Sequence, residues 1–304
     1  MKKKILIIGG TGFIGYHLAL RCINLGWNVS SISTKKPKKI RYISKVKYLI
    51  CDIANKKLLQ NKINTNFDYV VNLGGYVDHS NKKKTYNSHY IGCKNLTSIF
   101  LRKKPIAFVQ IGSCIEYGLK SSPQKEKITS KVKELKSIYG KAKLLATNHL
   151  LDLNRKKNFP SIILRLYLAY GPKQDANRFI PIIIKGCLEN KKFPCSNGNQ
   201  FRDFIHIKDV IRAIFKCLKN KNAIGQIINI GSGKPKKIKN IILLINRIVK
   251  KGYPQFGKIK LRKDEILKLY PNINKARKTI NWSPKVQFNK GLENTISFYK
   301  KLYN

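Results

Sequence analysis

The sequence predicts an α/β fold, in which a Rossmann-type doubly wound parallel sheet carries a smaller C-terminal lobe. Two observations predict it. Short β-branched apolar runs alternate with segments of helical spacing through the first half of the chain, and a glycine-rich turn directly follows the first of these runs. Such alternation favours a parallel sheet with helices on both faces, because each helix has to cross between neighbouring strands.

The individual elements can be placed from the apolar pattern. The runs expected to be strands are residues 4–8, 28–33, 46–50, 68–73, 106–112, 161–167 and 227–230. Residues 12–25 and 139–155 carry apolar side chains three and four positions apart, which is typical of amphipathic helices.

The pattern changes after the Tyr-Gly-Pro at 170–172, where prolines and glycines begin to separate shorter elements. We therefore expect a dinucleotide-binding domain over residues 1–170, with its sheet completed by residues 203–231. Residues 171–304 are expected to form mainly the second lobe.

The 304-residue chain carries 63 Lys and Arg against 14 Asp and Glu, a formal net charge of +49. A charge of this size can serve nucleic-acid or membrane binding. However, the lysines are spread over nearly every segment together with many Asn and Ile, without a basic stripe or an interleaved aromatic platform. This distribution indicates a compositional bias, so no nucleic-acid partner is expected.

Membrane and metal signals are weak. The apolar run after the N-terminal lysines ends at a glycine pair, and the longest other runs are broken by Arg165, Gly or Pro. Seven scattered cysteines, without a CxxC or a nearby His at metal spacing, indicate reduced core thiols and no metal site. These features predict a cytoplasmic protein without membrane insertion.

The turn after the first strand reads GGTGFIG, with Gly9, Gly12 and Gly15 three residues apart. In a Rossmann-type turn the first glycine permits the tight turn, the second lets the backbone approach a pyrophosphate, and the third lets helix and strand pack closely. The phosphates then lie at the helix N-terminus. The predicted dinucleotide site at this turn comprises Gly9, Thr11, Gly12, Phe13, Ile14 and Gly15.

The end of the second strand selects the cofactor. An acidic residue there binds the ribose 2′-hydroxyl of NAD, but this chain has Ser33, followed by a Thr and by Lys35 and Lys36. Nothing there repels a 2′-phosphate and two cations attract it, so NADP is favoured and NAD stays possible. Asp52 and Ile53, after the third strand, are expected near the adenine, although Asp52 could equally cap the next helix.

Two tyrosines are followed four residues later by a lysine: Tyr90 by Lys94, and Tyr139 by Lys143. On a helix this spacing puts both side chains on one face, where the ammonium can stabilise a phenolate. Ser113 separates the two pairs, because it ends an apolar strand at the place where open α/β sheets bind ligands. It precedes Tyr139 and follows Tyr90.

These motifs together resemble those of the extended short-chain dehydrogenases/reductases that act on nucleotide sugars. The resemblance covers essentially the whole chain, in that family's order and spacing: GGTGFIG, CDI, GSCIEYG, YGKAK, LRLYLAYGP, RDFIHIKDV, NIGSG and INWSPKVQFNKGL. It implies that Tyr139 and Lys143 are the catalytic pair, that Ser113 is the catalytic hydroxyl, and that Tyr90 and Lys94 are structural. It also implies reversible hydride transfer between the nicotinamide and a sugar carbon.

Within that resemblance, Tyr139 gives or takes the hydroxyl proton, Lys143 holds the nicotinamide ribose and lowers the Tyr139 pKa, and Ser113 orients the substrate oxygen. It further implies that the second lobe binds a nucleotide-diphosphate sugar. A homodimer is expected through helices near residues 90–104 and 139–155.

Three residues are expected at the substrate nucleotide. Arg202 matches a family arginine that binds the substrate pyrophosphate; the alternative is a structural ion pair with Asp203 or Asp209. Asn177 and Arg178 are further candidates to face the nucleotide.

The chain departs from the family beside Ser113. Nucleotide-sugar 4,6-dehydratases carry acidic residues there, because eliminating water needs an extra acid and base. Here these positions hold Cys114 and Ile115, and Glu116 would point to the other side if the strand continued. Dehydratase activity is therefore not expected.

Other departures affect the sugar site. Leu168 stands where many epimerases and dehydratases have an Asn, and His89 stands three residues before Gly92 where an Asn is usual, which favours a structural role for His89. Asp78 and His79 lie near the expected sugar without an assigned role.

The most economical activity is reduction of a 4-keto(-6-deoxy) nucleotide sugar with Tyr139 as proton donor. The alternative is a nucleotide-sugar 4-epimerase with tightly bound NAD. A third hypothesis, a non-enzymatic RNA-binding protein of the same fold, has only the charge in its favour.

Overall fold

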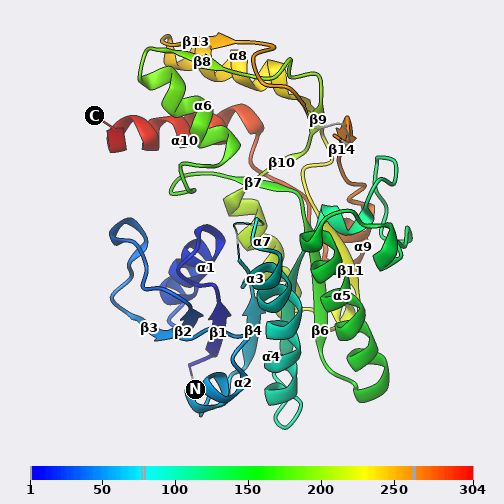
Figure 1. Ribbon diagram of the computed structural model, residues 1–304. Helices are drawn as coiled ribbons and strands as arrows, with labels where there is room; N and C mark the ends of the chain where they lie inside the picture. The colour runs from blue at the N-terminus through cyan, green and yellow to red at the C-terminus, as the bar shows by residue number, and fades with distance from the viewer. Residues whose placement is uncertain (1, 77, 79, 262–264, 304) are drawn as a thin grey trace.

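The computed structural model describes residues 2–76, 78, 80–261 and 265–303. Its centre is a parallel sheet in the order β11-β6-β5-β4-β1-β2-β3 (Figure 1). The strands are β1 (Lys4–Ile8), β2 (Asn28–Ser33), β3 (Val46–Ile50), β4 (Tyr69–Asn72), β5 (Ala107–Ser113), β6 (Ser161–Leu166) and β11 (Ile227–Ile230). They confirm the seven predicted strands and the α/β fold class.

The direction of the winding reverses at β1. From this strand, β2 and β3 extend the sheet to one side, whereas β4, β5, β6 and β11 extend it to the other. Connections therefore leave β1 and β4 in opposite directions, and the crevice between their carboxyl ends is where doubly wound sheets bind ligands.

Two apolar cores flank the sheet, because successive side chains of a strand point to opposite faces. In β1, Ile5 and Ile7 enter one core, and Leu6 and Ile8 enter the other. The first face is covered by α1 (Phe13–Asn24), α7 (Ile207–Leu218) and α9 (Asn274–Ile280). The second is covered by α2 (Lys56–Lys62), α4 (Gly92–Phe100) and α5 (Ile138–Lys157). The helices predicted from 12–25 and 139–155 are confirmed as α1 and α5.

Before α4, the chain forms α3 (Lys82–Tyr86) and a π-helical turn, η2 (Asn87–Ile91). A short 3-10 helix, η3 (Cys114–Tyr117), follows β5 directly. The predicted fifth strand therefore ends at Ser113, and the side-chain alternation of a strand does not extend to Glu116.

A third apolar core fills the region beyond the carboxyl ends of the sheet (Figure 1). Its helices are α6 (Phe179–Leu188), α8 (Ile238–Val249) and α10 (Phe288–Tyr303). In the described part of this region, the short strands form three small sheets. They are β7 (Leu168–Tyr170) with β10 (Phe204–His206), β8 (Lys192–Pro194) with β13 (Tyr253–Gln255), and β9 (Phe201–Arg202) between β12 (Lys236–Lys237) and β14 (Lys268–Leu269). The division into domains at residue 170 stays a prediction, although β11, from the segment 203–231, does join the main sheet.

The loop between β2 and β3 is tied to the segment after β7. Arg41, which is 5% exposed, donates from Nε and Nη2 to the Lys173 carbonyl at 2.9 and 2.6 Å. Its Nη2 also lies 3.0 Å from Asp175 Oδ1. Lys173 in turn donates from Nζ to the Tyr16 hydroxyl of α1 at 2.6 Å. These contacts hold the β2–β3 loop against the chain that leads into the third core.

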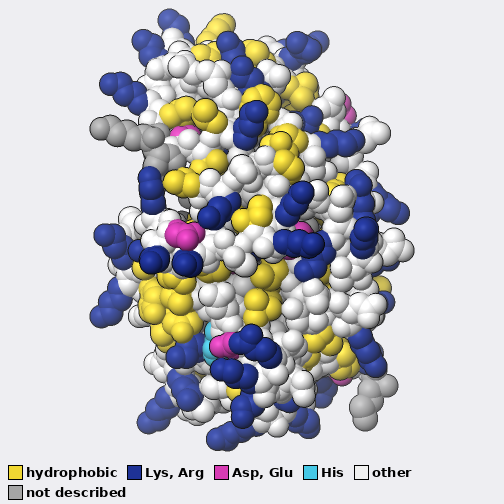
Figure 2. Space-filling model, turned by 90° about the vertical axis from the view of Figure 1, so that its right-hand side faces the viewer, with side chains coloured by type: hydrophobic (Ala, Val, Ile, Leu, Met, Phe, Trp, Pro, Cys, Tyr) yellow, Lys and Arg dark blue, Asp and Glu magenta, His cyan; other side chains and the backbone are white. Residues whose placement is uncertain are grey.

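The spread of basic side chains over the surface and the burial of the cysteines both agree with the sequence analysis. Lys and Arg are scattered over the face in Figure 2, over both the sheet region and the part above it. All seven cysteines are buried, which confirms the prediction that they are core residues. Within the described ranges, helices with the length and apolarity needed to cross a membrane are absent.

Candidate active site

The turn between β1 and α1 leaves space at the start of the helix. Gly9 has a φ of 76° and its N–H donates to the Ile32 carbonyl at 2.7 Å, which draws the turn against β2. A Cβ on Gly15 would lie 2.3 Å from the Gly9 carbonyl oxygen, so the helix can approach the turn only without that side chain. Gly12 precedes α1 without a side-chain cap, and the first turn, which starts with Phe13 and Ile14, has no acidic residue. Main-chain N–H groups at this end fit the diphosphate of a dinucleotide.

Ser33, at the end of β2, reaches this turn. Its Oγ accepts the Thr11 N–H at 3.4 Å, and Lys35 and Lys36 follow with exposed side chains. The structure therefore brings the residue expected to select the cofactor next to the glycine-rich turn, without an acidic side chain at that strand end.

Asp52 and Ile53 follow β3, whose last residue is paired in register with Ser33. Asp52 Oδ1 accepts the Ala54 N–H at 2.9 Å, whereas the cap of α2 is Asn55. The alternative prediction that Asp52 caps the helix is wrong, because the chain makes one further turn before α2 begins. Ile53 is buried, and its carbonyl accepts the Asn95 amide of α4 at 2.9 Å.

Ser113, Tyr139 and Lys143 come together at the carboxyl end of β5. Ser137 caps α5 by accepting the Gly140 N–H at 3.0 Å, which starts the helix so that Tyr139 lies in its first turn. The Ser113 hydroxyl hydrogen-bonds Tyr139. One helical turn on, Lys143 lies with its Nζ 5.9 Å from the centre of the Tyr139 ring. The pair that was selected over Tyr90 and Lys94 by the position of Ser113 thus lies in a compact cluster with that serine.

The pKa values of Tyr139 and Lys143 are shifted in opposite directions. Burial raises the pKa of Tyr139 to about 12, while the Ser113 hydrogen bond and the Arg178 guanidinium act to lower it. Burial lowers the pKa of Lys143 to about 8, and its Nζ donates to the Ile111 carbonyl at 2.6 Å. The expected depression of the Tyr139 pKa by Lys143 is therefore not found, because burial dominates and the ammonium is directed at a carbonyl. At neutral pH the phenol is protonated.

His89 contacts the same cluster. Its ring packs edge-on against Tyr139, with centroids 5.0 Å apart, and its Nε2 lies 3.3 Å from the Tyr76 carbonyl. Sequence reasoning placed His89 only as a substitution in a helix pattern, since the π-helical turn that directs it toward Tyr139 has no clear sequence signal. Tyr90, by contrast, packs against Tyr86 with ring centroids 5.4 Å apart.

The residues expected at the substrate nucleotide are arranged differently. Arg178, the residue before α6, is exposed but acts electrostatically on Tyr139; Asn177 beside it is exposed as well. Arg202 forms an ion pair with Glu265. The alternative prediction of a pair with Asp203 or Asp209 is wrong, because both carboxylates are used elsewhere.

Those two carboxylates bind main-chain groups. Asp203 accepts the Ser232 N–H and hydroxyl, the latter at 2.8 Å. Asp209 accepts the N–H groups of Lys285 and Val286, the latter at 2.9 Å. Both carboxylates therefore hold loops together, and Arg202 is paired with Glu265.

The side chains beside Ser113 are largely apolar. Cys114 is buried together with Tyr167 and Leu269, and Ile115 and Ile266 pack against them. Leu168 is 40% exposed. Asp78 accepts the Ser80 N–H at 3.1 Å, and His79 lies outside the described residues.

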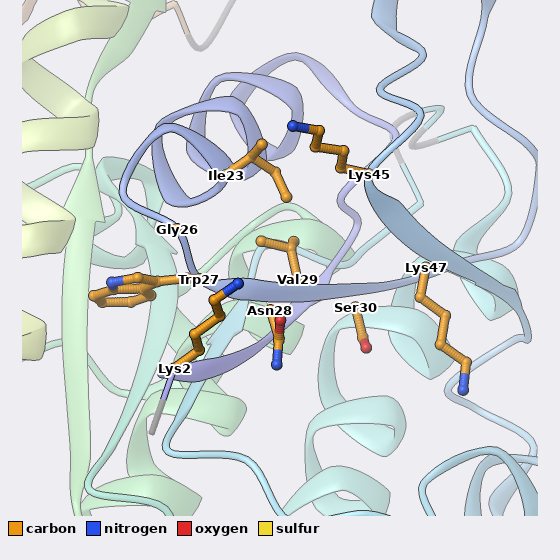
Figure 3. A pocket seen from close by; sticks show the side chains of 9 residues that line it. All are labelled: Lys2, Ile23, Gly26, Trp27, Asn28, Val29, Ser30, Lys45 and Lys47. Atoms are coloured by element: carbon orange, nitrogen blue, oxygen red, sulfur yellow. The ribbon is translucent and has the colours of Figure 1, made fainter.

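A cavity of about 390 Å³ lies elsewhere, at the amino ends of β1, β2 and β3 (Figure 3). Lys2, Trp27 and Lys45 are among the side chains around it. Because Ser113 is at the carboxyl end of the sheet, this cavity does not belong to the candidate active site.

A family model, two curated proteins and a crystal structure each match most of this chain. A family model described as the NAD dependent epimerase/dehydratase family matches residues 5–231. A CDP-abequose synthase from Salmonella muenchen is 24% identical over 310 residues, covering 98% of both chains. A UDP-N-acetyl-alpha-D-glucosaminuronate decarboxylase from Bacillus cytotoxicus is 24% identical over 331 residues, covering 100% of both. The crystal structure of a UDP-glucuronic acid 4-epimerase from Bacillus cereus, in complex with UDP-glucuronic acid and NAD, has a TM-score of 0.86 and 28% identity, covering 99% of this chain and 100% of that one.

Proposed function

Because this chain belongs to the NAD-dependent epimerase/dehydratase family of nucleotide-sugar enzymes, we propose that it reduces a 4-keto-6-deoxy nucleotide sugar with NADPH. The observation that carries the proposal is the cluster of Ser113, Tyr139 and Lys143, with Cys114 and Ile115 in place of dehydratase acids. A phenol that is protonated at neutral pH can give a proton, and the neighbouring thiol and alkyl groups cannot serve an elimination.

The reduced nicotinamide, when bound, supplies the hydride that adds to the carbonyl carbon. The Ser113 hydroxyl orients the carbonyl oxygen, and Tyr139 gives its phenolic proton to that oxygen, so that the ketone becomes an alcohol. Lys143 would hold the nicotinamide ribose. The phenolate left behind is stabilised by the Ser113 hydroxyl and the Arg178 guanidinium, and it regains its proton from solvent. Arg202, and with it Asn177 and Arg178, would hold the nucleotide-diphosphate part of the substrate.

The residues at the glycine-rich turn support a dinucleotide, and those after β2 support NADP. Ser33 reaches the turn through Thr11, and the exposed ammonium groups of Lys35 and Lys36 can pair with a 2′-phosphate. Asp52 and Ile53 would lie at the adenine. A homodimer through α4 and α5 belongs to the same proposal.

A nucleotide-sugar 4-epimerase is the second candidate. It is favoured by the 28% identity to the UDP-glucuronic acid 4-epimerase, whose structure contains NAD. The two activities differ in the fate of the cofactor, since an epimerase reoxidises the cofactor that it reduces and a reductase releases it.

Mass spectrometry of the dinucleotide released on denaturing the purified protein separates the candidates, together with NADPH consumption on a CDP- or dTDP-linked 4-keto-6-deoxy sugar. Consumption of NADPH by protein that carries no resident NAD is expected. Stoichiometric NAD, with interconversion of 4-epimers and without net NADPH consumption, would replace the reductase with the epimerase.

A further inference from the structure

Glu116 is fully buried, and both oxygens of its carboxylate accept hydrogen bonds. Oε1 accepts the Ser113 N–H at 2.7 Å. Oε2 accepts the Thr147 hydroxyl at 2.8 Å and the Arg165 Nε–H at 3.0 Å. The donors lie on β5, α5 and β6, so one carboxylate joins the three elements around the candidate active site.

The contact with α5 falls on the face that carries the proposed catalytic pair. Tyr139, Lys143 and Thr147 are spaced four residues apart and therefore lie along one side of the helix. Glu116 binds the third of these positions and also the main chain of Ser113. It consequently fixes the position of the Ser113 hydroxyl relative to the helix.

The surrounding residues leave a fitted space for this carboxylate. Gly112 is paired with Arg165 in the register of β5 and β6, and a Cβ on Gly112 would lie 2.5 Å from Glu116 Oε1. The Arg165 guanidinium lies over the Tyr117 ring, 4.3 Å from its centre, and the Tyr117 hydroxyl donates to Asn229 on β11 at 2.8 Å. The arginine that balances the charge of Glu116 is thus itself held in place.

We propose that Glu116 is a positioning residue for the reduction, which anchors Ser113 and supplies a buried negative charge beside Lys143 and Tyr139. This inference rests on the proposed function for its role in turnover. The geometry of the three hydrogen bonds carries it, and the electrostatics of the cluster give it a test.

Two groups act to raise the pKa of Lys143 against its burial: Glu116 and Cys93 of α4. Burial raises the pKa of Cys93 to about 12, so this thiol is uncharged at neutral pH and Glu116 is the anion that remains. The Tyr139 ring also faces Lys143 from α5.

Tyr139 is surrounded in a similar way. Glu116 and Cys114 raise its pKa, Ser113 and Arg178 lower it, and the His89 ring packs against it. The pKa of the Cys114 thiol is raised to about 12 by burial, so it too is uncharged at neutral pH. Removing the charge of Glu116 therefore favours deprotonation of both Lys143 and Tyr139.

Glu116→Gln tests the inference through two pH profiles, one for kcat/KM of keto-sugar reduction and one for NADPH binding followed by NADPH fluorescence. We expect the alkaline limb of both profiles to move to lower pH by about one unit, with about a tenfold loss of kcat/KM on that limb. Glu134→Gln removes one carboxylate from an exposed 3-10 helix and is the control matched in charge. Thr147→Val keeps the charge of Glu116 and should leave the limb where it is in the wild-type protein.

A folded Glu116→Gln protein with an unmoved limb would overturn the inference, as would an equal movement in Glu134→Gln. If Glu116→Gln does not fold because Arg165 loses its buried partner, the double variant Glu116→Gln/Arg165→Met removes both charges. Its alkaline limb must then move in the same direction but by less, because the loss of the guanidinium favours the charged form of Lys143. NADPH binding can be measured without a sugar. If the wild-type protein does not turn over the keto sugar, but Glu116→Gln still shifts the pH profile of NADPH binding, the proposed reduction is rejected and the role of Glu116 at Lys143 is retained.

Discussion

Arg202 and Glu265 form an ion pair across 63 positions of the chain, between β9 and the segment that precedes β14. The Arg202 side chain is 11% exposed, and its Nη1 also donates to the Phe201 carbonyl at 2.8 Å. Burial lowers the pKa of the guanidinium, and Glu265 acts in the opposite direction. A substrate diphosphate that binds Arg202 must therefore share the guanidinium with Glu265 or displace it.

Replacing Arg202 by Met should raise KM for the nucleotide sugar at least about tenfold, because a charge-assisted contact to the diphosphate is lost. We expect kcat and the Kd of NADPH to stay within about threefold of the wild-type values, since Ser113, Tyr139 and Lys143 are unchanged. Steady-state kinetics measure KM and kcat, and NADPH titration measures the Kd.

The informative comparison is Glu265→Gln, which removes the same ion pair and leaves the guanidinium. KM should not rise in this variant. An equal rise of KM in both variants would show that the ion pair, and not phosphate binding, is the contribution of Arg202.

Tyr139→Phe should abolish turnover, because it removes the proton donor, while the Kd of NADPH stays near the wild-type value. The aromatic packing against His89 is kept by the Phe ring, so the fold should be retained. Keto-sugar reduction and NADPH titration on the same preparation measure the two effects. Turnover at a substantial fraction of the wild-type rate would remove Tyr139 from the mechanism.

The pH dependence of the reduction should follow Lys143. Burial lowers the pKa of Lys143 from 10.5 to about 8, so its charged form is present at neutral pH and is lost as the pH rises through that value. The pKa of Tyr139, about 12, lies too high to set this limb. We expect kcat/KM to fall above about pH 8, and Lys143→Arg to move the fall to higher pH, because a guanidinium keeps its proton. A limb at the same pH in both proteins would assign it to another group.

The parts of the site that were predicted are those whose geometry is local. Tyr139 and Lys143 lie on one face of α5 because of their spacing, and Ser113 ends a strand because the apolar run ends there. The strands could be predicted for the same reason, because each coincides with a short apolar run of the sequence. What the sequence could not predict depends on where separate elements meet.

Glu116 and Arg202 illustrate this limit. The direction of the Glu116 side chain depends on the chain turning into η3 directly after Ser113, and its partner Arg165 is 49 positions away. With 63 basic residues against 14 acidic ones, sequence order does not indicate which arginine each acid will join. An ion pair of Arg202 with Asp203 or Asp209 was the alternative to phosphate binding, but tertiary packing pairs Arg202 with Glu265.

Cofactor choice should respond to Ser33. Ser33→Asp places a carboxylate where the ribose of the adenosine is expected, beside the Thr11 N–H that Ser33 now accepts. The carboxylate repels a 2′-phosphate and can bind a 2′-hydroxyl, so the ratio of NADPH to NADH affinity should fall by about tenfold to a hundredfold. Fluorescence titration with both cofactors measures the ratio. Ser33→Ala is the control, because it removes the hydroxyl without adding charge and should preserve the preference for NADPH.

Asp175 should contribute to stability in a pH-dependent way. Although burial raises the pKa of this carboxyl, Arg41 and Lys38 hold it below its ordinary value of 3.8. A pKa lowered in the folded state means that the carboxylate stabilises the fold above the unfolded-state pKa and ceases to do so as the pH falls through the folded-state value. Since Asp175 is partly exposed, its carboxylate should contribute about 1 kcal/mol or less to the free energy of unfolding. Asp175→Asn is therefore expected to lower Tm by a few degrees at neutral pH and to match the wild-type protein once the pH has fallen below the lowered folded-state pKa of Asp175. Asp152→Asn, which removes an exposed acid paired within α5, should lower Tm less at neutral pH. If Asp175→Asn and Asp152→Asn lowered Tm equally, the contacts of Arg41 with the Lys173 carbonyl alone would hold the β2–β3 loop in place.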